Sequence, residues 1–146
     1  MFEPYHRAEL LLIEDNPADV SLTQRALSHT RSSPRLSVVR DGDEAVAFLR
    51  RMGQYESAPR PDLIFLDLNV PKRDGRTLLA ELKSDPDLRN IPVIVLTTSE
   101  AEEDISQAYD LYANCYVKKP VEMQRFIQMI QSVEEFWLNV VRLPGV

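Results

Sequence analysis

Leu63-Ile64-Phe65-Leu66-Asp67 is the stretch that decides the fold of this 146-residue chain. An unbroken apolar run of this length is typical of a strand that is buried on both faces, as strands of parallel sheets are. The run ends abruptly in a carboxylate, and Leu68-Asn69-Val70-Pro71 then breaks away before Asp74-Gly75. We therefore expect Asp67 at the carboxyl end of a central strand, where open α/β sheets bind their ligands.

Other apolar runs also end in polar side chains. The run 10–13 ends in Glu14-Asp15, the run 91–96 ends in Thr97-Thr98-Ser99, and the run 115–118 ends in Lys119-Pro120. If these runs are neighbouring parallel strands, their ends meet at one edge of the sheet, next to Asp67. Acids, a hydroxyl and a lysine gathered in this way predict phosphoryl chemistry on an aspartate.

The whole chain alternates strands with helices. We expect strands over 9–13, 35–39, 63–67, 92–96 and 115–118, and helices over about 17–30, 41–52, 75–84, 99–111 and 121–141. Asp41 and Ser99 are the expected N-caps of two of these helices, Ser99 in a capping box with Glu102. Five βα units with short connections predict one α/β domain, a five-stranded parallel sheet with helices on both faces.

Length and composition set limits on the class of protein. A chain of 146 residues with 44% hydrophobic residues is an ordinary single globular domain. Its net charge of −6 argues against non-specific nucleic-acid binding. No apolar run is long enough to predict a membrane span, and we expect no signal peptide from the start Met1-Phe2-Glu3-Pro4. Because the single cysteine, Cys115, has no partner for an internal disulfide, we expect a cytoplasmic protein.

The predicted cluster of acids requires a cation. Glu14, Asp15 and Asp67 would repel one another at short range, and ligands that are all oxygen favour Mg²⁺. His6 and His29 are expected at the surface, so zinc is not expected.

The lysine and the threonine at the other strand ends are suited to a phosphate. Lys119 can reach one as a point charge, and a cis bond to Pro120 would aim its side chain inward. Strand alternation places Lys118 on the opposite side. Thr97 supplies a neutral donor for a phosphate oxygen.

Five segments in this order resemble response-regulator receiver domains. They are Leu11-Leu12-Ile13-Glu14-Asp15-Asn16, Phe65-Leu66-Asp67-Leu68-Asn69-Val70-Pro71, Asp74-Gly75, Val95-Leu96-Thr97-Thr98 and Tyr116-Val117-Lys118-Lys119-Pro120. The resemblance covers roughly residues 8–133 and implies the flavodoxin-like receiver fold. The helical segment 134–146 would be an extension of that domain.

The resemblance also implies a role for each site residue. Asp67 is similar to the phosphoacceptor, Asp15 to a direct Mg²⁺ ligand, Glu14 to a ligand acting through water, Asn69 to a ligand through its carbonyl, Thr97 and Tyr116 to the switch pair, and Lys119 to the phosphate-binding lysine. Two positions depart from the common pattern. Glu14 stands where many receivers have Asp, and the branched side chain of Thr98 would narrow access to Asp67 and slow phosphotransfer.

Further details resemble the single-domain regulators that are paired with bacterial and cyanobacterial phytochromes. They include Asn16-Pro17-Ala18-Asp19, Arg60-Pro61-Asp62-Leu63, Ala113-Asn114-Cys115-Tyr116 and Phe136-Trp137-Leu138. This likeness implies a phytochrome-type sensor histidine kinase as the partner, with homodimers formed through the last helix and its extension.

The last helix carries more apolar residues than one core-facing stripe needs. Phe136 and Trp137, near its end, would leave a large exposed apolar patch on a monomer. A homodimer interface at these two residues is our preferred interpretation. A tail that folds back on its own domain is the alternative.

Two other functions fit parts of the pattern. A phosphohydrolase of the haloacid-dehalogenase kind also uses an aspartate nucleophile and Mg²⁺, but it would show Asp-x-Asp where this chain has Asp67-Leu68-Asn69. A pseudo-receiver would lack one of the acids, the threonine or the lysine. The sequence therefore predicts a phosphoacceptor rather than an enzyme. Its output stays open between a protein-binding switch, a sink, and a shuttle to a downstream phosphotransfer protein.

Overall fold

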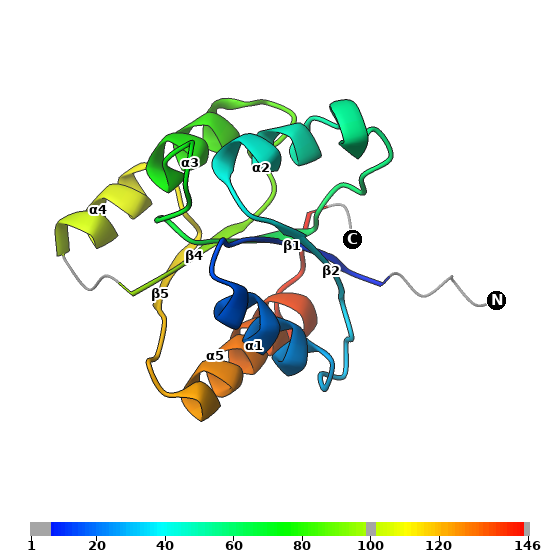
Figure 1. Cartoon of the computed structure of the whole chain (residues 1–146), viewed down its shortest axis with the longest axis vertical. Helices are drawn as coiled ribbons and strands as arrows, with labels where there is room; N and C mark the ends of the chain where they lie inside the picture. Colours follow the sequence, from blue (N-terminus) through cyan, green and yellow to red (C-terminus); the bar gives the residue numbers. More distant parts are fainter. Residues whose placement is uncertain (1–6, 99–101, 145–146) are drawn as a thin grey trace.

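The core of the protein is one parallel sheet of five strands (Figure 1). The computed structural model describes residues 7–98 and 102–144, the first three of the second range by their backbone alone. The strands are β1 (Glu9–Ile13), β2 (Arg35–Val39), β3 (Leu63–Leu66), β4 (Val93–Thr97) and β5 (Cys115–Lys118), in the order β2-β1-β3-β4-β5. β3 is therefore central, with β1 and β4 beside it, and the predicted α/β fold with its parallel sheet is confirmed.

Helices cover both faces of the sheet. α1 (Pro17–Leu27) and α5 (Met123–Glu135) lie on one face, and α2 (Gly42–Leu49), α3 (Gly75–Ser84) and α4 (Glu102–Asp110) lie on the other (Figure 1). Along β3, the side chains of Leu63 and Phe65 pack in the apolar core under α1 and α5, and those of Ile64 and Leu66 pack in the core on the opposite face. This alternation is why the strand has no polar residue until Asp67.

Two helices end earlier than predicted because of local chemistry. α1 stops at Leu27, since the hydroxyls of Ser28 and Thr30 donate to carbonyls of its last turn. α2 stops at Leu49, and Arg51 follows with a φ of 54°, which no helix can contain. Its predicted N-cap, Asp41, is confirmed by the bond from the Glu44 N–H to its side chain. The Ser99 cap lies outside the described residues.

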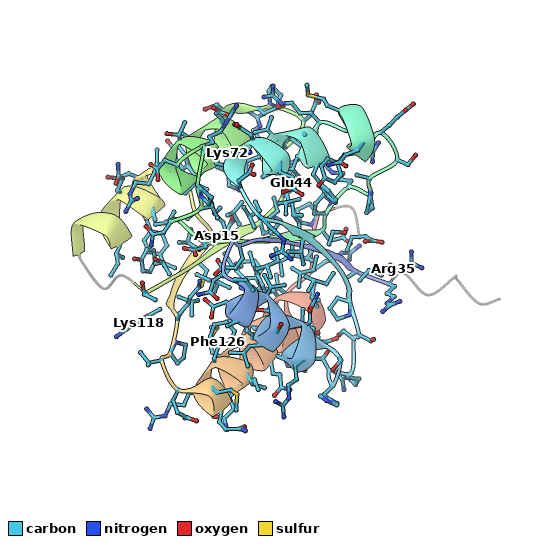
Figure 2. The ribbon with its side chains drawn as sticks, viewed as in Figure 1. Asp15, Arg35, Glu44, Lys72, Lys118 and Phe126 are labelled. Carbon is cyan, nitrogen blue, oxygen red and sulfur yellow. The ribbon has the colours of Figure 1, made fainter. Side chains whose placement is uncertain are left out.

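The C-terminal helix buries one apolar stripe, and the chain that follows it packs back onto its own domain. α5 continues through a π-helical turn, Phe136–Val140, so the helical segment ends one residue before the predicted position. Figure 2 shows Phe126 between α5 and the sheet, where it is buried. Trp137 is half-buried against the same core, and Leu143 is buried beyond the turn. Packing of the tail onto its own domain thus covers some of the apolar residues that lie outside the core-facing stripe of the helix. Phe136, however, stays 51% exposed.

No helix among the described residues is both long enough and apolar enough to cross a membrane.

Glu134 is a buried carboxyl group of α5, next to Thr30 and Ser32 of the loop after α1. It is 1% exposed, and within the described part of the chain its Oε1 atom has no hydrogen-bond partner. Burial raises the pKa of Glu134, an effect that a hydrogen bond with Ser32 opposes and the neighbouring charge of Glu135 reinforces. The folded protein therefore binds a proton at Glu134 more readily than the unfolded chain does.

This buried carboxyl should make stability fall as pH rises. Because the folded pKa of Glu134 is raised, its contribution is fully present below its ordinary value of 4.5 and is lost as pH rises through the folded pKa. Each unit of raised pKa corresponds to about 1.4 kcal/mol. We expect Glu134→Gln to flatten this part of the pH profile of the free energy of unfolding in urea. Glu56→Gln, at an exposed carboxyl remote from α5, is the matched control, and identical slopes for the two variants would refute the assignment.

Candidate functional site

The acids Glu14 and Asp15 lie between the end of β1 and the start of α1. The Glu14 N–H donates to the Val39 carbonyl at 3.0 Å, which keeps the chain extended for one residue beyond the strand. Asn16 then caps α1, its Oδ1 accepting from the Ala18 N–H at 2.9 Å. As a result Glu14 is 1% exposed, whereas Asp15 points into solvent.

Asp67 lies just beyond β3, beside these acids. Its N–H donates to the Ile13 carbonyl at 3.0 Å, and its Oδ1 accepts from the Asn69 N–H at the same distance. Carboxylate oxygens of Glu14, Asp15 and Asp67 come within 4.8 Å of one another. The convergence predicted from two strand ends is therefore present. Gly75 closes the following loop, because a Cβ atom there would lie 2.5 Å from the Leu68 Cα.

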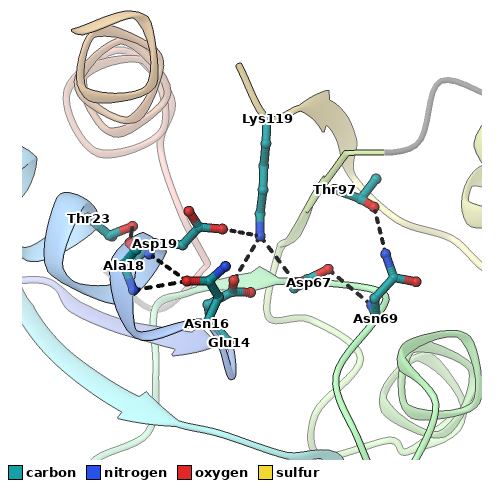
Figure 3. A network of polar contacts seen from close by, with 9 residues as sticks. All are labelled: Glu14, Asn16, Ala18, Asp19, Thr23, Asp67, Asn69, Thr97 and Lys119. Atoms are coloured by element: carbon teal, nitrogen blue, oxygen red, sulfur yellow. Dashed lines mark hydrogen bonds and ion pairs between the residues drawn. The ribbon is translucent and has the colours of Figure 1, made fainter. Parts of the chain in front are cut away.

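Lys119 reaches into this acidic cluster from the end of β5 (Figure 3). Its Nζ donates to Glu14 Oε1 at 2.8 Å, to Asp19 Oδ2 at 2.9 Å and to Asp67 Oδ2 at 3.1 Å. The lysine is only 6% exposed. Among the described residues, Lys119 is the cation that contacts all three carboxylates, which come from the loop after β1, from α1 and from the end of β3.

The inward direction of Lys119 does not come from a cis bond. No described peptide bond is cis, and this includes the bond to Pro120. The Lys119 N–H instead donates to the Thr97 carbonyl at 2.8 Å and continues the β4–β5 pairing by one residue. Strand alternation then aims Lys119 inward and leaves Lys118 exposed at the sheet edge (Figure 2).

Asp19 is a site residue that the sequence analysis missed. It lies in the first turn of α1, and its N–H donates to the Asn16 Oδ1 at 3.3 Å. The cap sets where the helix begins, and the turn that follows places the Asp19 carboxylate against Lys119. The usable signal was an acid in the first helical turn directly after two acids at a strand end.

The predicted switch residues lie on adjacent strands. Thr97 is fully buried at the end of β4, and the Asn69 amide donates to its hydroxyl at 3.4 Å (Figure 3). Tyr116 on β5 is half-buried against the core under α2 and α3, and its N–H donates to the Tyr109 hydroxyl at 3.3 Å. Thr98 is exposed and lines the cavity over Asp67.

Comparison with known proteins decides the family. The family model of the response regulator receiver domain matches residues 10–131. The chain belongs to this family. Response regulator Rcp1 of Synechocystis sp. is 49% identical to it over 136 residues, which cover 93% of this chain and 92% of Rcp1. This sequence similarity to Rcp1 supports neither of the two alternative functions, a phosphohydrolase or a pseudo-receiver.

Solved structures give the same result. The phosphorylated cyanobacterial phytochrome response regulator RcpA superposes with a TM-score of 0.93 at 49% identity, covering 96% of this chain and all of RcpA. The Mn²⁺-bound form of Rcp1 superposes with a TM-score of 0.91 at 48% identity, covering 94% of this chain and 99% of that one. These similarities establish the receiver fold, whose site fits the role of a phosphoacceptor.

The ionisable groups of the receiver site shift one another's pKa values. Burial, and then a hydrogen bond with Asp67, hold the pKa of Glu14 well above its usual range. Burial alone would raise the pKa of Asp67, but bonds from Glu14, the Asn69 N–H and Lys119 lower it instead. Burial opposes the charge of Lys119, yet Glu14 and Asp67 raise its pKa. These shifts favour a neutral Glu14 beside an ionised Asp67 and a charged Lys119.

The receiver pocket fits a hard divalent cation. A cavity of about 460 Å³ lies over Glu14, Asp15, Asp67 and Lys119. Among the described residues, Glu14 Oε2 is a buried oxygen with no hydrogen-bond partner, as expected where a ligand is to be bound. The ligand atoms in this cluster are carboxylate oxygens, which suit Mg²⁺ or Mn²⁺ rather than zinc. His29 is exposed elsewhere, and His6 lies outside the described residues.

Proposed function

We propose that this receiver accepts a phosphoryl group onto Asp67 from a phosphohistidine of a sensor histidine kinase. The observation that carries the proposal is the position of Asp67 at the end of the central strand. There Lys119 Nζ lies 3.1 Å from its carboxylate, and two further acids lie within 4.8 Å. A nucleophile, a phosphate-binding cation and ligands for a divalent cation are thus together in one pocket.

The transfer follows from these positions. A carboxylate oxygen of Asp67 attacks the phosphorus in line, and the P–N bond breaks as the P–O bond forms. The electron pair of the broken bond stays on the imidazole nitrogen, which takes up a proton. Lys119 and the Thr97 hydroxyl hold the phosphoryl oxygens. Mg²⁺, held by Asp15, Asp67, the Asn69 carbonyl and, through water, Glu14, would supply positive charge against the same oxygens.

The phosphoryl group then shifts the population of a second conformation of the switch residues. Thr97 gives up its bond with the Asn69 amide, now 3.4 Å long, and moves toward the phosphoryl group. Tyr116, on the neighbouring strand and only half-buried, turns into the space that opens. The altered β4–β5 surface would contact the next protein, either a target or a downstream phosphotransfer protein.

The proposed cation makes a direct test possible. Because Asp15 is the exposed acid of the pair and Glu14 is buried and holds a proton, Asp15→Ala should weaken Mg²⁺ binding more than tenfold, at a cost of more than about 1.4 kcal/mol. Glu14→Gln should weaken it less. Titration of Mg²⁺ followed by NMR shifts around Asp67 measures both variants. An unchanged Mg²⁺ affinity in Asp15→Ala would refute its role, and Asp110→Asn on exposed α4 serves as control.

We propose a phytochrome-type kinase as the partner. The support is the likeness to Rcp1, to RcpA and to a bacteriophytochrome response regulator whose structure superposes with a TM-score of 0.73 at 40% identity over 92% of this chain. Such a partner places the exchange in the cytoplasm. The test compares the rate of phosphotransfer from a phosphorylated phytochrome-type kinase with the rate from an unrelated histidine kinase. Equal rates would count against the pairing.

We also propose a homodimer through the C-terminal helix, with the receiver and its extension 134–146 acting as one domain. Support comes from Phe136 and Val140, which stay largely exposed at the end of that helix. Trp137 already packs against its own core, so we expect Phe136 to contribute more to the interface than Trp137.

A charged residue at Phe136 should therefore yield a folded monomer. Truncating a large aromatic in an interface often costs 2 kcal/mol or more, and a buried charge adds to that cost. Gel filtration coupled to light scattering, at several protein concentrations, compares Phe136→Glu with Met52→Glu, which alters an exposed apolar residue after α2, away from the C-terminal helix. A wild type that is monomeric throughout would contradict the dimer and leave the folded-back tail as the sufficient explanation.

A further inference from the structure

All three donors of Lys119 are already in use. An ammonium group has three N–H bonds, and those of Lys119 go to Glu14, Asp19 and Asp67 at 2.8, 2.9 and 3.1 Å. A phosphoryl oxygen on Asp67 can be held by Lys119 only if one of these carboxylates gives way. The identity of that carboxylate decides how easily the phosphorylated state forms.

Asp19 is the carboxylate that can leave at the lowest cost. The Glu14 side chain is almost completely buried and cannot turn to water, and Asp67 itself carries the phosphoryl group. The Asp19 side chain is 22% exposed, so water can replace the lysine. It also lies in the first turn of α1, where the helix dipole stabilises a negative charge.

We propose that Asp19 is a positioning residue that competes with the phosphoryl group for Lys119. The Asp19–Lys119 ion pair stabilises the unphosphorylated receiver, and its release accompanies the transfer of the lysine to the phosphoryl oxygens. This inference rests on the proposed function of Asp67. It assigns to α1 a part in setting the balance between the two states of the site.

The test measures affinity for a phosphoryl mimic. Beryllium trifluoride in the presence of Mg²⁺ is titrated into the full chain and followed by ¹⁹F NMR and calorimetry. Asp19→Asn should bind it about three- to fivefold more tightly than wild type, the range expected for a partly exposed ion pair. Asp19→Glu, which keeps a carboxylate within reach of Lys119, should restore affinity close to that of wild type. Thermal unfolding of each variant verifies that it is folded.

A double-mutant cycle separates competition for Lys119 from general repulsion. In the Lys119→Gln background, Asp19→Asn should no longer change the affinity, because the residue acts through the lysine. The same gain in both backgrounds would show plain charge repulsion and would overturn the proposal. Unchanged or weaker binding by Asp19→Asn alone would also overturn it.

A separate measurement distinguishes a failure of the Asp19 proposal from a failure of the proposed phosphoacceptor function. Wild type must bind the mimic, and Asp67→Asn must not. If wild type binds it and Asp19→Asn behaves like wild type, only the role of Asp19 is wrong. If wild type fails to bind it, the phosphoacceptor role fails, and the inference about Asp19 fails with it.

Discussion

Replacing Asp67 with Asn should abolish phosphorylation completely. The amide has the shape of the carboxylate and can still accept the bond from the Asn69 N–H, now 3.0 Å long. It is not a nucleophile toward phosphorus, however, so no P–O bond forms. Removing a negative charge from a cluster of acids also relieves repulsion, so the variant should fold normally.

The measurement is intact mass after incubation with acetyl phosphate and Mg²⁺. Wild type should gain one phosphoryl group, Asp67→Asn none, and Asp110→Asn, on the exposed surface of α4, as much as wild type. A phosphoryl gain that persists in Asp67→Asn would mean that another residue is the acceptor.

Replacing Lys119 with Met should be the most destabilising change in the site. Lys119 donates to carboxylates on three elements, and its loss leaves buried acids without a cation. Breaking a buried ion pair on one side costs about 3 kcal/mol or more. We expect the lower end of that range, because Glu14 already holds a proton and the Asp19 side chain can turn to water.

Urea unfolding at neutral pH in the presence of a chelator measures this loss. Mg²⁺ should restore part of the lost free energy of unfolding, because a cation among the acids replaces the missing charge. Lys118→Met, on the exposed neighbour, should change it by less than about 0.5 kcal/mol. If the two variants were equally stable, Lys119 would not be the cation on which the acidic cluster depends.

The strands and most of the site could be predicted from the sequence because both follow from local patterns. A run such as Leu63–Leu66 has few alternatives to a buried strand, and parallel strands bring their carboxyl ends to one edge. Glu14, Asp15, Asp67 and Lys119 could therefore be assigned to one pocket without coordinates. Their convergence is confirmed by distances of a few ångströms.

The features that the sequence did not yield depend on tertiary contacts. Asp19 binds a lysine 100 positions away, and its place after two acids at a strand end indicates the pocket but not this partner. The inward direction of Lys119 follows from its pairing with Thr97 on β4. Trp137 and Leu143 fold onto their own domain through a π-helical turn that apolar periodicity does not reveal.

The most direct test of the central claim is to locate the phosphoryl group after transfer from a phosphorylated sensor histidine kinase. Borohydride reduces an aspartyl phosphate to homoserine, and mass spectrometry of the peptides then identifies the modified position. We predict homoserine at position 67 alone, only when Mg²⁺ and the phosphorylated kinase are both present. Homoserine at another aspartate, or transfer without any modification at Asp67, would contradict the account.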